Sequence, residues 1–248
     1  MKIFKDLAYG PYKDNVLDLY LPEEECHNLF LYFHGGGLEH GSKNLNVDNL
    51  PSYLISQGIA VASAEYRMYP SAKYPDFVED AAAAAAWLKK NIGQYGEDTH
   101  ICIGGSSAGG YLSMMLCFDE KWFAAHDLTP NDFAGFVHDA GQPTNHFNVL
   151  RERGIDTRRV MIDDSAPLYH IGKAESYPPM LFIVSDNDME NRYEQTQLVL
   201  STLRHFRYDM SKVKYTLCHG PHCAYVSKIE EDGTSTFGKM ICEFIKEY

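Results

Sequence analysis

Short apolar segments alternate with helical patterns along most of this 248-residue chain. The apolar segments are rich in β-branched and aromatic residues, which is typical of strands, and they occupy residues 29–33, 59–63, 101–103, 134–137, 180–184 and 213–217. Most are apolar with little interruption, as expected for parallel strands that are buried on both faces. Helical patterns lie between and after them, near residues 47–57, 76–92, 107–118, 191–206 and 235–246. The alternation predicts an α/β fold with a mostly parallel central sheet flanked by helices.

Two regions depart from this alternation. Residues 2–9 and 15–20 favour an antiparallel hairpin at one edge of the sheet. Residues 141–165 carry many charged side chains and no clear strand, so we interpret them as a small lid or insert. A solvated surface excursion explains the same composition equally well. We expect a single domain over 1–248, because a chain of this length with 45% apolar residues can build one large core.

The amino-acid composition limits the kinds of partner that the protein is expected to bind. The 22 lysines and arginines against 34 acidic residues give a net charge of −12, so we expect binding neither to nucleic acid nor to an anionic membrane. The six cysteines are scattered rather than clustered as in a small secreted domain. The first residues contain no apolar stretch before a cleavage site, and no apolar run is long enough to span a membrane. These features predict a cytoplasmic protein.

A glycine-rich motif directly follows the 101–103 strand and precedes a helix. It contains the pattern Gly-x-Ser-x-Gly over residues 105–109, with Ser107 at its centre. A serine on such a tight turn needs glycine on both sides, and its hydroxyl is then presented above the sheet as a nucleophile. The N–H of Ala108 would point to where an oxyanion forms. Ser106 fits the pattern less well, and a glycine-rich turn with a capping serine is the alternative interpretation.

A second glycine motif, His34-Gly35-Gly36-Gly37, directly follows the 29–33 strand. Successive glycines expose backbone N–H groups and let a substrate carbonyl approach closely. A flexible hairpin loop is the alternative. That alternative does not explain why this loop and the Ser107 turn come after strands that end at the same edge of the sheet, where ligand sites gather.

A base and an orienting acid are found downstream. Asp188 follows the 180–184 strand and is placed to hold a histidine, whereas Asp186 is closer to the strand end and better suited to the turn itself. After the 213–217 strand, His222 is the candidate general base, in a loop that also contains Gly220 and Pro221. Ordinary turn residues explain both segments equally simply.

The same loop permits a zinc-site hypothesis. Cys218, His219, His222 and Cys223 are all residue types that bind zinc. Arranging four ligands from six consecutive residues around one tetrahedral ion is difficult, so we expect no metal and no other cofactor.

The order of these motifs resembles the α/β-hydrolase fold and, within it, the hormone-sensitive-lipase-like esterases. The resemblance covers roughly residues 28–246 and includes four further segments, Glu65–Pro70, Tyr74–Asp80, Ser165–Pro167 and Tyr177–Leu181. It implies a nucleophile at Ser107, a base at His222, an acid at Asp188 and an oxyanion hole formed by three N–H groups, those of Gly36, Gly37 and Ala108. Gly35 is a close competitor for that last role.

The chain also departs from this family. His34 comes too early for the usual N-terminal helical cap, so we expect no large cap domain, and the size is closer to compact acetyl and feruloyl esterases and to kynurenine formamidase. Cys223 stands where a glycine usually follows the histidine. No sequence argument decides which other residues line a pocket; the candidates are Tyr32, Tyr69, Asp139, Gln142 and His146.

These observations together predict a serine carboxylesterase. Its partner would be a small-molecule ester with a short acyl or small aromatic acyl group, acetylated sugars included, and turnover would pass through an acyl-enzyme. An arylformamidase-type amidase with the same triad is one alternative. A non-catalytic ligand-binding protein on a hydrolase scaffold is the other.

Overall fold

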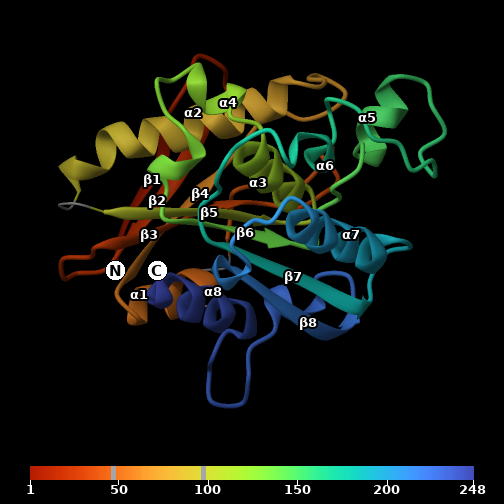
Figure 1. The fold of residues 1–248 in the computed structure, drawn as a ribbon. Helices are drawn as coiled ribbons and strands as arrows, with labels where there is room; N and C mark the ends of the chain where they lie inside the picture. The colour runs from red at the N-terminus through yellow and green to blue at the C-terminus, as the bar shows by residue number, and fades with distance from the viewer. Residues whose placement is uncertain (46–48, 96–98) are drawn as a thin grey trace.

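The computed structural model describes residues 1–45, 49–95 and 99–248, and its centre is one eight-stranded sheet (Figure 1). The strand order is β1-β2-β4-β3-β5-β6-β7-β8. The strands are β1 (Lys2–Ala8), β2 (Val16–Leu21), β3 (Asn28–Phe33), β4 (Ile59–Ala64), β5 (His100–Ser106), β6 (Gly135–Asp139), β7 (Met180–Asn187) and β8 (Val213–Pro221).

Strands β3 to β8 pair in parallel, whereas β1 pairs antiparallel with β2 and β2 antiparallel with β4. The predicted hairpin at the sheet edge is therefore confirmed, and so is the mostly parallel sheet. Side chains of β3 and β4 are buried almost without exception, which explains their uninterrupted apolar sequences. β8 lies at the other edge, and its burial alternates between partly covered and exposed residues.

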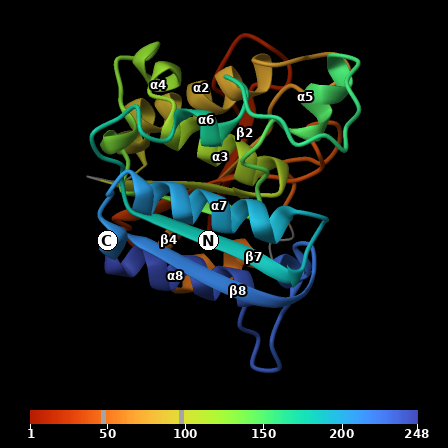
Figure 2. The same ribbon diagram turned by 45° about the vertical axis from the view of Figure 1, so that its right-hand side comes forward.

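Helices cover both faces of the sheet, as Figures 1 and 2 show. One face carries α2 (Asp76–Asn91), α3 (Ala108–Phe118) and α7 (Arg192–His205), and the other carries α1 (Leu50–Ser56) and α8 (Thr236–Glu247). The alanines of α2 permit close packing, while α8 buries an apolar stripe that contains Phe237, Ile241 and Phe244. The five predicted helices are thus confirmed, except that residues 47 and 48 of the first lie outside the described residues.

Shorter helices occur in the connections between strands. They are α4 (Lys121–Ala124), α5 (Phe147–Glu152) and α6 (Pro167–His170), with 3₁₀ turns η1 (Ile92–Gln94), η2 (Pro130–Asp132), η3 (Met210–Lys212) and η4 (Ala224–Ser227). Segment 141–165 contains α5 and no strand. It is not a loose excursion, because Asn145 binds Ser165 Oγ through its side chain (3.0 Å) and Met161 O through its backbone N–H (2.9 Å).

Two further findings concern membrane-spanning helices and disulfide bonds. No helix in the part of the chain that the structure describes has the length and apolar character needed to cross a membrane. All six cysteines lie within the described ranges, and each is a free thiol.

Candidate active site

The chain turns sharply at Ser107, between the end of β5 and the start of α3. Ser107 has φ +56° and ψ −109°, a strained conformation for a residue with a side chain, and its N–H donates to the carbonyl of Asp139 on β6 (2.8 Å). A Cβ atom on Gly105 or Gly109 would lie 2.4 or 1.9 Å from the carbonyl oxygen of Phe33. Only glycine fits these two positions, which is the steric requirement predicted for the turn.

The three side chains proposed for a triad meet at this edge of the sheet. His222 Nε2 lies 2.9 Å from Ser107 Oγ, and His222 Nδ1 lies 2.5 Å from Asp188 Oδ1. Because the carboxylate accepts a hydrogen bond from the Nδ1–H group, Nε2 is left as the acceptor that faces the serine hydroxyl. The side chain of Asp188 is 1% exposed and that of His222 is 23% exposed. The acid is therefore buried, while the histidine is accessible to a substrate.

Neighbouring residues form a second, separate acid–histidine pair. His219 Nδ1 lies 2.5 Å from Asp186 Oδ2, and the N–H of Gly220 donates to Asp186 Oδ1 (3.0 Å). Asp186 therefore stabilises the turn, whereas Asp188 faces the reactive histidine. Since the two histidines are committed to different carboxylates, the four-ligand zinc arrangement does not form, and no cluster of three or more metal-binding side chains occurs among the described residues.

The surroundings of Asp188 favour its ionised form. Burial by itself would raise the pKa of this carboxyl, but the hydrogen bond with His222 and the N–H groups of Met189 (2.7 Å) and Ser185 (3.3 Å) hold the pKa below its usual value. A charged carboxylate at this position keeps the imidazole oriented and stabilises the imidazolium that forms when the histidine accepts a proton.

The His34–Gly37 loop lies next to the Ser107 turn. A Cβ built on Gly35 would contact the backbone of Ser106 (3.1 Å), which shows how closely the two loops approach. Gly36 has φ +113°, and a Cβ there would lie 1.8 Å from the carbonyl oxygen of His40. No acceptor among the described residues binds the N–H of Gly36 or Gly37. These donors, together with the N–H at the first position of α3, are free to bind an oxyanion.

Residues after β4 hold this loop in place. His34 Nε2 lies 3.0 Å from Glu65 Oε1, and its ring stacks on Tyr66 at 4.4 Å, while the Tyr66 hydroxyl donates to the carbonyl of His34 (2.8 Å). Glu65 also accepts the N–H of Lys43 (3.1 Å). The segment that resembles the esterase family at 65–70 thus has a structural task, which is to support the glycine loop.

Cys223 occupies the position after the histidine in a left-handed conformation, with φ +56°. Glycine adopts this conformation without strain, which accounts for the glycine usually found there. The thiol lies 3.6 Å from His222 Nε2, and burial raises its pKa. The thiol is therefore neutral and takes no part as a nucleophile.

Asp139 is a fully buried acid beside the triad. Its carboxylate accepts a hydrogen bond from the hydroxyl of Tyr225, and its carbonyl holds the Ser107 N–H. Burial raises the pKa of Asp139 to about 7, against the opposing effects of Ser106, Tyr225 and the nearby His222. Asp139 thus changes charge within the neutral range, unlike Asp188.

This raised pKa makes folding stability depend on pH. An unfolded chain releases the Asp139 proton near pH 4, whereas the folded chain releases it only near pH 7. The free energy of unfolding that this proton contributes is therefore lost as the pH rises from about 4 to about 7. Asp139→Asn cannot lose a proton, so it lacks this pH-dependent loss. We expect the free energy of unfolding of the variant minus that of the wild type to increase by on the order of 2 kcal/mol between pH 5 and pH 8. Urea unfolding at both pH values measures this. A difference between variant and wild type that is constant with pH contradicts it.

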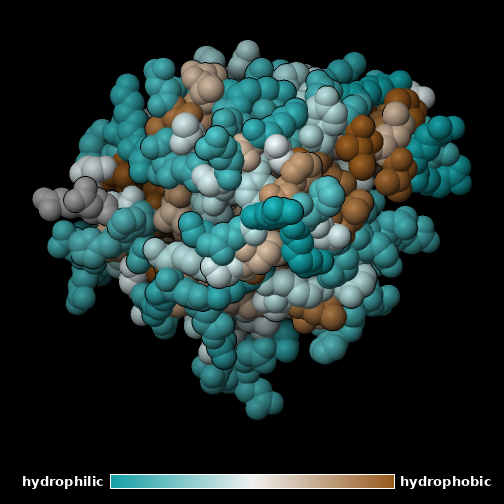
Figure 3. Space-filling model, in the orientation of Figure 1, coloured by the Kyte–Doolittle hydropathy of each residue, from teal (hydrophilic) through white to brown (hydrophobic). Residues whose placement is uncertain are grey.

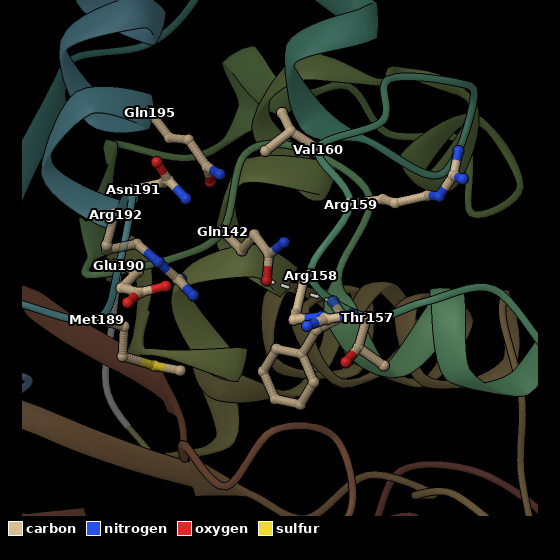
Figure 4. Close-up of a pocket in the computed structure, with 11 residues that line it drawn as sticks. Gln142, Thr157, Arg158, Arg159, Val160, Met189, Glu190, Asn191, Arg192 and Gln195 are labelled. Carbon is tan, nitrogen blue, oxygen red and sulfur yellow. Dashed lines mark hydrogen bonds between the residues drawn. The ribbon is translucent and has the colours of Figure 1, made fainter.

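A cavity of about 450 Å³, within the usual size range of small-molecule sites, lies near the triad, although none of the three triad residues lines it. Phe147 at its edge packs against Gly37 of the glycine loop, and Met189 next to Asp188 forms another part of its wall. The complete lining is Gln142, Phe147, Thr157, Arg158, Arg159, Val160, Met189, Glu190, Asn191, Arg192 and Gln195 (Figure 4). In the view of Figure 3, apolar residues gather on the side where α5 and α7 lie.

Sequence reasoning found only part of this lining. Of the five candidate pocket residues, Gln142 lines the cavity, whereas Tyr32, Asp139 and His146 are buried and Tyr69 lines a different depression. Segment 141–165 supplies much of the wall, in keeping with a binding insert. Arg192 was missed, although an arginine in the first turn of a helix is an unusual choice that could have drawn attention to it.

Comparison with known proteins shows which proteins this chain resembles. Residues 17–128 match the BD-FAE family model. Esterase B from Lactobacillus rhamnosis superposes on 98% of this chain, with 84% of its own chain covered, a TM-score of 0.75 and 21% sequence identity. The chain has the α/β-hydrolase fold. A truncated carbohydrate esterase from gut microbiota is another structural neighbour, with a TM-score of 0.72, 17% identity, and coverage of 100% of this chain and 96% of that one.

Among curated proteins, the chain is 26% identical to esterase LipC of Mycobacterium tuberculosis over 195 residues. The match covers 71% of this chain and 48% of LipC. The chain spans at most about half the length of the first curated relatives it matches.

Proposed function

We propose that this α/β hydrolase is a serine carboxylesterase for esters with short acyl or small aromatic acyl groups, acetylated sugars included. The single observation that carries the proposal is the continuous contact from Asp188 through His222 to Ser107, at 2.5 and 2.9 Å, beside a loop with free N–H groups. Relatives that are named as esterases support the same class of reaction.

Each group then has one task in the reaction. His222 Nε2 accepts the hydroxyl proton as Ser107 Oγ attacks the ester carbonyl, and Asp188 stabilises the imidazolium. The N–H groups of Gly36, Gly37 and Ala108 bind the oxyanion. His222 then gives its proton to the leaving alcohol, and a water molecule deprotonated by the same histidine hydrolyses the acyl-enzyme. The mechanism requires no cofactor.

The lining of the cavity supports a short or polar acyl group. Eight of its eleven residues are polar or charged, and only Phe147, Val160 and Met189 are apolar. A long alkyl chain gains free energy only when it leaves water for an apolar surface, so the polar ends of these eight side chains limit how much of such a chain the cavity stabilises, although their stems add apolar surface.

A series of 4-nitrophenyl esters from acetate to dodecanoate tests this proposal. We expect kcat/KM to be at least about tenfold higher for acetate and butyrate than for dodecanoate, because each buried methylene is worth about 0.8 kcal/mol only in an apolar pocket. Equal values along the series would contradict the short-acyl preference. Hydrolysis of N-formylkynurenine in preference to naphthyl acetate would indicate an amidase instead.

The cytoplasmic location expected from the sequence remains a prediction, and so do a small-molecule ester as partner and the lack of binding to nucleic acid and membranes.

A further inference from the structure

Arg192 is the unusual feature of the cavity beside the triad. It is the first residue of α7, where the partial positive charge of the helix disfavours a cation, and it is only 4% exposed. Burial of a charge without an opposite charge is costly. No carboxylate among residues 1–45, 49–95 and 99–248 lies within ion-pair distance of its guanidinium. Neither the helix nor a direct ion pair therefore explains why an arginine is buried at this position.

One N–H group of the Arg192 guanidinium is hydrogen-bonded, and its other donors remain available. Its Nη1 donates to the carbonyl of Ala140 (2.7 Å), and the adjacent carbonyl of Asp139 accepts the N–H of Ser107. A guanidinium has five N–H donors, so most of the donors of Arg192 remain available. Arg192 lines the cavity, and Figure 4 shows its side chain extending from α7 toward Gln142.

We propose that Arg192 forms a subsite for a carboxylate group on the substrate, so that the enzyme prefers esters that carry a negative charge. This inference rests on the proposed esterase function. The charge of Asp188 acts on Arg192 from beyond ion-pair distance, whereas a substrate carboxylate would form a direct ion pair, and its planar shape matches the guanidinium edge with two parallel hydrogen bonds. Although burial lowers the pKa of Arg192 to about 10, the group stays positively charged at neutral pH.

The other arginines of the cavity differ from Arg192 and offer controls. Arg158 is 88% exposed in its side chain and already paired with Asp156 (2.6 Å). Arg159 also lines the cavity, but Figure 4 shows its side chain extending away from Arg192 and Gln142. Arg159→Gln therefore removes one positive charge from the same cavity without touching the proposed subsite.

Two matched pairs of esters test the subsite in each half of the substrate. Mono-4-nitrophenyl glutarate is compared with 4-nitrophenyl pentanoate, and 4-acetoxybenzoate with 4-acetoxytoluene. We expect the wild type to prefer the carboxylate in one pair by about 10- to 100-fold in kcat/KM, since hydrogen bonds to charged groups have this strength. Arg192→Met is expected to abolish the preference, Arg192→Lys to retain part of it, and Arg159→Gln to keep it within about twofold.

Different failures of this test have different meanings. Hydrolysis of all four esters with no preference for charge overturns the subsite and leaves the esterase proposal intact. An equal loss on charged and neutral esters in Arg192→Met, with a shifted pH profile, also overturns the subsite, because Arg192 would then act through the nearby Asp188. If no ester is hydrolysed, the proposed function fails instead.

A binding measurement tests the subsite without turnover. Monomethyl glutarate and 4-acetoxybenzoate are titrated by calorimetry into Ser107→Ala and into the double variant with Arg192→Met. We expect at least one ligand to bind, with an affinity at least about tenfold weaker in the double variant. Absence of binding by both ligands, or equal affinity in the two proteins, overturns the subsite.

Discussion

Replacing Ser107 with alanine is expected to lower kcat on 4-nitrophenyl acetate by about 10⁴-fold or more, as loss of the nucleophile does in other serine hydrolases. The physical reason is that His222 Nε2, 2.9 Å from the hydroxyl, would have no oxygen to activate. Intact-mass spectrometry after incubation with a fluorophosphonate measures the same property directly. One adduct is expected on the wild type and none on the variant.

Ser106 provides the matched control for this experiment. It is the neighbouring serine, buried as the last residue of β5, and it does not contact His222. Ser106→Ala should therefore still form the adduct. Labelling that survives in Ser107→Ala but disappears in Ser106→Ala would reverse the assignment of the nucleophile.

The second large effect is expected at Asp188. Asp188→Asn leaves the shape of the side chain unchanged but removes the negative charge that fixes the His222 tautomer, so we expect kcat to fall about 10⁴-fold. The adjacent pair provides a matched control, because Asp186 binds His219 with the same 2.5 Å contact and its other hydrogen bond is to Gly220, not to the triad. Asp186→Asn should keep kcat within about threefold.

Steady-state kinetics on both variants decide between the two acids. A large loss in Asp186→Asn with a small one in Asp188→Asn would show that the pairing of acids and histidines differs in the working enzyme. Thermal unfolding of each variant separates an effect on folding from one on catalysis.

Much of the sheet could be predicted from the sequence because β3 to β7 are buried on both faces and show continuous apolar segments. β8 was predicted only to residue 217 but extends to Pro221. As an edge strand it is partly solvated, so the apolar signal ended before the strand did. The Ser107 turn and the glycine loop were recognisable because backbone geometry restricts both to glycine-rich sequences.

The cavity could not be predicted in the same way. Phe147 meets Gly37 although 110 positions separate them, and only the tertiary structure brings the two together. Arg192 was unusual in sequence only as a cation in the first turn of a helix, and its burial and its contact with Ala140 after β6 appear only in the tertiary structure. Asp139 was a candidate for the pocket, but it lies beneath the triad, where Tyr225 covers its carboxylate.

The strand order also determines when reactivity arises during synthesis. The glycine loop and Ser107 belong to the first half of the chain, whereas Asp188 and His222 follow β7 and β8, which are added last at one edge of the sheet. A ribosome-bound chain that has folded only through β6 presents a serine and an oxyanion loop without a base. Under the proposed mechanism the triad is therefore complete only after β7 and β8, the last two strands of the sheet, have been synthesised and have joined its edge.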